Sequence, residues 1–182
     1  MKDLPYFVAG SPSPSERVVQ FSVPAFSFVN QDGSPLNDSF VRGKIWVAHY
    51  FFLACPSICA KMITGLQMVQ SIYKADDDVK LVSLTVDPAE DSVAALKHYA
   101  VRREANPRQW QFGTGEKKAL YAFAREGLGI AAADGDGGPR DFIHSDTLVL
   151  IDRNCHIRGY YDGTSPAAIS HLIKDIRTLE KN

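Results

Sequence analysis

Two cysteines, Cys55 and Cys59, are four residues apart and follow an apolar run that predicts a buried strand. Pro56 suits the first position of a helix, so we expect Cys55 at the strand-to-helix corner and Cys59 one turn inside the helix, on the same face. Residues one turn apart have Cα atoms about 6 Å from each other, which a disulfide can span. Because a helix N-terminus favours anions, we expect Cys55 to ionise readily. The spacing alone allows a redox pair, two soft metal ligands or two unconnected core cysteines.

Apolar periodicity predicts the elements that must position these side chains. We expect a hairpin around residues 26–34, strands at 45–53, 80–86, 110–112, 147–151 and 157–161, and helices at 55–72, 92–100, 120–127 and 165–179. Helices that cross over between strands imply a parallel sheet core, and the last two strands imply an antiparallel hairpin. This order predicts an α/β protein with a thioredoxin-like fold, an N-terminal β-hairpin extension and insertions.

A third metal ligand must come from elsewhere in the chain, and His144 is the candidate. It lies between a glycine-rich loop at 134–139 and the strand predicted at 147–151, a junction that in thioredoxin-like topology lies beside the helix carrying the cysteines. Two thiolates and an imidazole form a soft, three-coordinate set that selects Cu(I) and keeps Cu(II) accessible, whereas zinc prefers a fourth ligand. The structural alternative is an ordinary loop histidine.

The composition limits the classes of function. The chain has 182 residues, a net charge of -1 and three cysteines, which suits one domain and is too few cysteines for a disulfide scaffold. Balanced charge disfavours a nucleic-acid partner, and no apolar stretch is long enough to span a membrane. We expect residues 1–20 to form a flexible linker and residues 21–182 the thioredoxin-like domain. The N-terminus lacks the apolar core of a signal peptide, so the protein is either cytosolic or has lost its leader.

Three separated segments resemble the Sco (SenC) family of copper-binding, thioredoxin-fold assembly factors for cytochrome oxidase. They are the apolar strand leading into CPSIC at 55–59, LTVDPAED at 84–91, and IHS at 143–145 followed by LVLID at 148–152 and RGYYDG at 158–163. Together with the elements between them, these segments cover roughly residues 21–180. The chain departs from the family at Ala60, where a proline is usual, and at Cys155, where a glycine is common and which we interpret as a free turn thiol.

The resemblance implies that Cys55, Cys59 and His144 bind copper and that Asp87 lies near them and affects metal transfer. It implies a copper-site subunit of cytochrome c oxidase as the recipient, with a thiol reductant protein as a further partner. Family members are usually tethered to a membrane and face the periplasm or intermembrane space, so the resemblance implies a periplasmic, membrane-anchored protein whose anchoring segment is absent from this chain.

Three functions remain open on the residues alone. The first is copper delivery, and the second is a thiol–disulfide oxidoreductase with Cys55 as nucleophile and Cys59 as resolving thiol. The third is a redox or copper sensor. Thioredoxins use a shorter cysteine spacing with a proline opposite it, and peroxiredoxins place a threonine where this chain has Phe52. Both differences favour metal binding over redox catalysis.

Overall fold

The structure is a computed structural model that describes residues 4–11, 13–16, 20–55, 57–130, 143 and 145–181. Its strands are β1 (Ser27–Asn30), β2 (Pro35–Asn37), β3 (Ile45–Phe51), β4 (Val79–Thr85), β5 (Trp110–Thr114), β6 (Thr147–Ile151) and β7 (Ile157–Asp162). Its α-helices are α1 (Ile58–Tyr73), α2 (Val93–Arg102), α3 (Lys117–Ala122) and α4 (Pro166–Leu179). A short 3₁₀ turn covers Asp38–Phe40, and a π-helical turn, Phe123–Gly127, extends α3.

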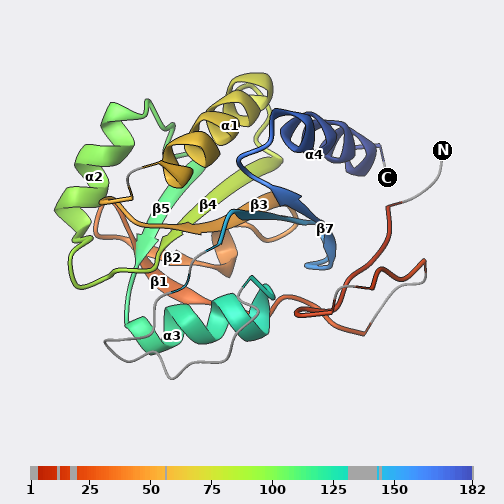
Figure 1. Ribbon diagram of the computed structural model, residues 1–182, viewed down its shortest axis with the longest axis horizontal. Coiled ribbons are helices and arrows are strands. Elements are labelled where there is room, and N and C mark those ends of the chain that lie inside the picture. Colours follow the sequence, from red (N-terminus) through yellow and green to blue (C-terminus); the bar gives the residue numbers. More distant parts are fainter. Residues whose placement is uncertain are drawn as a thin grey trace.

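The strands form one sheet in the order β2-β1-β5-β4-β3-β6-β7 (Figure 1). The central strands β3, β4 and β5 are parallel, and β6 and β7 continue the sheet antiparallel on one side. The hairpin β1–β2 extends the other side, because β1 pairs antiparallel with β5. The predicted α/β class, the parallel core and both hairpins are therefore confirmed.

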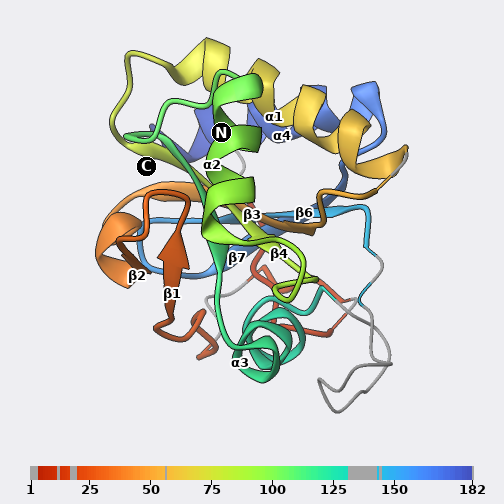
Figure 2. The same ribbon diagram turned by 90° about the vertical axis from the view of Figure 1, so that its left-hand side faces the viewer.

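Helices cover both faces of this sheet (Figure 2). Helices α1, α2 and α4 pack on one face, and α3 packs on the other. In β3, Ile45, Val47 and Phe51 belong to the first core, whereas Trp46 and Tyr50 belong to the second. Every residue of β3 and β4 is buried, which explains why apolar residues occur on both faces of these strands and do not alternate regularly with polar ones.

Helix α1 begins later than Pro56 predicts. Its first residue is Ile58, so Cys59 is the second residue of the helix and does not lie one turn inside it. Ser57 occupies the N-cap position but makes no capping hydrogen bond with its side chain. The backbone N–H of Cys59 instead donates to Sγ of Cys55 at 3.4 Å, so a thiol satisfies a donor that the helix cannot pair internally. Cys55 remains at the strand-to-helix corner, as expected.

The described part of the N-terminal segment lies against β7. The backbone N–H of Phe7 donates to the carbonyl of Ile157 at 3.0 Å, and the Arg158 side chain donates to the carbonyl of Pro5. The division into a linker at 1–20 and a domain at 21–182 stays a prediction. Within the described ranges, no helix is both long enough and apolar enough to cross a membrane.

Candidate metal centre

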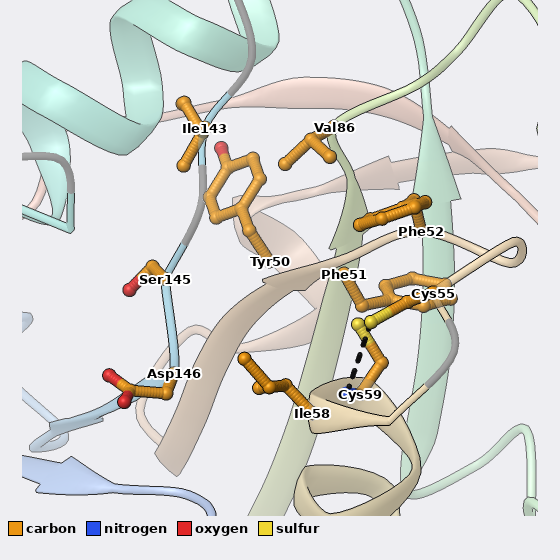
Figure 3. Close-up of a pocket in the computed structure, with 10 residues that line it drawn as sticks. All are labelled: Tyr50, Phe51, Phe52, Cys55, Ile58, Cys59, Val86, Ile143, Ser145 and Asp146. Atoms are coloured by element: carbon orange, nitrogen blue, oxygen red, sulfur yellow. Dashed lines mark hydrogen bonds between the residues drawn. The ribbon is translucent and has the colours of Figure 1, made fainter.

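The two cysteines meet at the carboxyl end of β3. Cys55 lies in the turn after the strand and is half-buried, and Cys59 is buried at the start of α1. Both thiols are free, and Figure 3 shows their sulfur atoms side by side, with the dashed line marking the hydrogen bond from the Cys59 backbone N–H to Cys55 Sγ. The expectation that the pair lies close enough to act as one dithiol or as two ligands agrees with this geometry.

The surroundings of the two thiols shift their pKa values in opposite directions. Burial opposes ionisation of Cys55, but hydrogen bonds from the Cys59 thiol and from the backbone N–H groups of Cys59, Ser57 and Ile58 outweigh it and lower the pKa of Cys55. Burial, together with the hydrogen bond that Cys59 donates to Cys55, raises the pKa of Cys59 to about 12. Cys55 is therefore the thiolate-forming member of the pair, and Cys59 is its proton donor.

A cavity of about 190 Å³ opens beside the two sulfurs. Its lining comes from three segments of the chain and comprises Tyr50, Phe51, Phe52, Cys55, Ile58, Cys59, Val86, Ile143, Ser145 and Asp146 (Figure 3). His144 lies outside the described residues, but the residues on both sides of it, Ile143 and Ser145, line this cavity. Ile143 and Ser145 thus lie at the same cavity as the cysteine pair.

The two aspartates of the segment after β4 have different surroundings. Asp87, which the resemblance places near the ligands, is not among the residues that line the cavity, although its neighbour Val86 is. Asp91 is 3% exposed, and its Oδ2 accepts hydrogen bonds from the Thr85 hydroxyl at 2.6 Å and the Leu53 N–H at 3.2 Å. Burial raises the pKa of the Asp91 carboxyl. The sequence gives no signal for the contact with Leu53, because the two residues are 38 positions apart.

Two other candidates lie away from the cavity. His49 is fully buried in β3, where its Nε2 is 2.6 Å from the Ser83 hydroxyl oxygen, and burial lowers its pKa to about 3. Cys155 occupies the turn between β6 and β7 with φ of 62° and packs against the core on the α3 side. Among the described residues, no group of three His, Cys, Asp or Glu side chains is arranged to hold a metal ion. The role of His144 as a third ligand stays a prediction.

The whole pattern matches a known family. Residues 15–180 match the family described as SCO1/SenC. A relative in Bacillus subtilis, named SCO1 protein homolog, is 26% identical over 162 residues, which is 88% of this chain and 83% of that protein. The match therefore includes both cysteines, the segment after β4 and the segment around position 144.

Solved structures show the same fold. A SCO1/SenC family lipoprotein from Bacillus anthracis has a TM-score of 0.75 and 27% identity over 89% of this chain and 96% of its own. BsSco, described as a member of the Sco family of cytochrome c oxidase assembly proteins with a disulfide switch, has a TM-score of 0.72 and 26% identity over 87% and 93%. Bradyrhizobium japonicum ScoI, solved with copper bound, has a TM-score of 0.70 at 17% identity over 87% and 99%. The thioredoxin-like fold predicted from the sequence is confirmed.

Proposed function

The chain belongs to the SCO1/SenC family, and from this premise we propose that it binds one copper ion and delivers it during cytochrome c oxidase assembly. The proposed ligands are Cys55, Cys59 and His144. One observation carries the proposal: two free, adjacent cysteines share a cavity with both chain neighbours of His144. The copper-bound ScoI and the assembly role of the Sco family support the choice of metal and process.

The donor set fits copper. Thiolates are the soft ligands that select Cu(I), and an imidazole nitrogen also suits Cu(II). The lowered pKa makes Cys55 the ligand that is ready to bind, whereas Cys59 must lose a proton when its sulfur becomes a ligand. Copper uptake through both thiols therefore releases a proton.

The rim of the cavity is open to a partner. Cys55 is half-buried rather than sealed, and the adjacent Ile58 is 48% exposed. Copper can pass to a recipient by exchange of one ligand at a time if the recipient's donors reach this rim. We propose the copper-site subunit of cytochrome c oxidase as recipient and a thiol reductant protein as the partner that keeps the cysteines reduced. A membrane-anchored, extracytoplasmic location is proposed on the likeness to the Bacillus anthracis lipoprotein.

Copper titration of the reduced protein tests the proposal. Cu(II) should give thiolate-to-copper charge-transfer absorption that saturates at one equivalent. Cys55→Ser or Cys59→Ser should weaken copper binding by more than about 100-fold. Serine is a hard donor that copper binds poorly, and losing a ligand costs more affinity than losing a residue that only hydrogen-bonds to a ligand. Cys155→Ser is the matched control and should bind normally. Loss of copper in that control, or full binding in either site variant, would contradict the assignment.

The opposite pKa shifts of the two cysteines favour a second candidate, a thiol–disulfide oxidoreductase. The Cys55 thiolate would attack a partner disulfide, form a mixed disulfide and release one partner thiolate. Deprotonated Cys59 would then attack Cys55 Sγ, close the Cys55–Cys59 disulfide and release the second partner thiolate.

Insulin reduction separates this candidate from copper delivery. We expect poor turnover, because the cysteine spacing differs from that of thioredoxins and the cavity contains the residues that flank His144 instead of the partnering proline. Turnover comparable to that of a thioredoxin would make the oxidoreductase the better account.

A further inference from the structure

We propose that Asp91 is a positioning residue that holds the turn carrying Cys55 at the carboxyl end of β4 and thereby sets where Cys55 lies relative to Cys59 at the start of α1. An effect of Asp91 on copper binding rests on the proposed function, whereas its effect on how the two cysteine sulfurs are placed does not. The inference begins from a carboxylate that is buried beside the cysteine turn and does not cap the helix that follows it.

The contacts of Asp91 join two parts of the chain. Its Oδ2 accepts the backbone N–H of Leu53, which is 38 residues away in the sequence and two residues before Cys55. The same oxygen accepts the hydroxyl of Thr85, the last residue of β4. The Thr85 hydroxyl oxygen in turn accepts the backbone N–H of Asp87 at 2.9 Å. Asp91 thus fastens the cysteine turn to the carboxyl end of the neighbouring parallel strand.

Capping does not explain why a carboxylate is buried at this position. Ser92 is the N-cap of α2, and its hydroxyl accepts the Ala95 N–H at 3.2 Å. The Asp91 backbone is held separately, because its N–H donates to the Asp87 carbonyl at 2.8 Å. A buried carboxylate is unfavourable unless hydrogen bonds compensate, and Oδ2 accepts the Leu53 N–H of the cysteine turn and the Thr85 hydroxyl at the end of β4.

Other described hydrogen bonds of the cysteine turn, residues 52–55, lie within the turn or run to the start of α1. Between the end of β3 and the start of α1, the N–H of Cys55 donates to the Phe52 carbonyl at 3.2 Å, which only closes the turn on itself. Further bonds join the turn to the start of α1, because Cys55 Sγ accepts backbone N–H groups of Ser57, Ile58 and Cys59. The Leu53–Asp91 hydrogen bond joins the turn to the segment that follows β4, and this tie sets where the Cys55 sulfur lies relative to Cys59.

The dithiol–disulfide equilibrium of the metal-free protein tests this inference. Oxidised glutathione takes up two electrons as the protein dithiol becomes a disulfide, and two glutathione thiols are released, so the ratio at equilibrium reports how well the sulfurs are held together. Asp91→Ala should lower the disulfide-to-dithiol ratio by about tenfold, because a small misplacement of reacting groups is costly. Asp91→Asn keeps an acceptor oxygen and should stay within about twofold of the wild type.

Control variants distinguish a positioning effect of the Asp91 side chain from an effect of its negative charge and from a failure to fold. Glu90→Ala removes a neighbouring exposed carboxylate and should leave the ratio unchanged. If Asp91→Ala does not fold, Thr85→Val, which removes the hydroxyl donor to Asp91, should lower the ratio, and Thr85→Ser should restore it. If Asp91→Ala folds, an unchanged disulfide-to-dithiol ratio in that variant would overturn the inference. If it does not fold, an unchanged ratio in Thr85→Val would do so. A fall in Asp91→Asn as large as in Asp91→Ala would assign the effect to charge and overturn it too.

Copper titration of the same variants distinguishes the inference from the proposed function. If the wild type takes up no copper while the glutathione ratios follow the expected pattern, the proposed function fails and the role of Asp91 stands. If the wild type binds one copper and Asp91→Ala keeps both the copper affinity and the wild-type glutathione ratio, the positioning role fails and copper binding stands.

Discussion

The two cysteines differ because of where each sulfur lies relative to the first turn of α1. Cys55 Sγ lies in front of the helix and collects hydrogen bonds from its free N–H groups, which favours the thiolate. Cys59 is buried within the first turn and donates its thiol proton to Cys55, which favours the neutral thiol. Cys55 is therefore the residue that can bind a metal ion or attack a disulfide as a thiolate. Cys59 holds the proton that leaves when its own sulfur becomes a ligand.

This asymmetry predicts a pH profile for alkylation of the reduced, metal-free protein. A lowered pKa means that the thiolate fraction of Cys55 rises at lower pH than for an ordinary thiol near 8.5. At pH 7, Cys55 should react with iodoacetamide more than about tenfold faster than Cys59, whose pKa is raised to about 12. Mass spectrometry of the separate peptides measures both rates. Faster modification of Cys59 than of Cys55 would show that the hydrogen-bond assignment is reversed.

The helices and strands were largely predictable from the sequence. Residues 45–51 and 79–85 carry apolar side chains on both faces because helices cover both faces of the sheet, and this pattern is visible without a structure despite the polar His49, Lys80, Ser83 and Thr85. Ser92 and Ser165 each cap a helix where the local sequence predicts a start. These signals are local, so they survive in a single sequence.

The start of α1 and the role of Asp91 could not be predicted in the same way. Pro56 is a good local signal for a first helical residue, but the Cys59 N–H bonds to the Cys55 sulfur and the helix begins at Ile58. The contact between Asp91 and Leu53 joins residues 38 apart, and no periodicity reports it. The sequence shows which residues could do chemistry, whereas tertiary hydrogen bonds decide where the sulfurs lie.

At the scale of the whole molecule, the candidate site is assembled where separate chain segments meet at one edge of the sheet. The carboxyl ends of the parallel strands β3 and β4 bring the cysteine turn and Val86 together, as α/β folds commonly do. The segment before β6 brings Ile143, Ser145 and Asp146 to the same cavity. The fold therefore brings Ile143 and Ser145, the chain neighbours of His144, to the cavity of the dithiol, and the proposed three-ligand copper site rests on this placement.

X-ray absorption at the copper edge tests this claim most directly. The protein loaded with one Cu(II) should show two sulfur scatterers from Cys55 and Cys59 and one imidazole nitrogen. His144→Ala should keep the sulfur shell and lose the imidazole signal, with weaker Cu(II) binding and a smaller effect on Cu(I), because two thiolates can still hold Cu(I). A wild-type spectrum without an imidazole, or an imidazole signal that persists in His144→Ala, would contradict the three-ligand site.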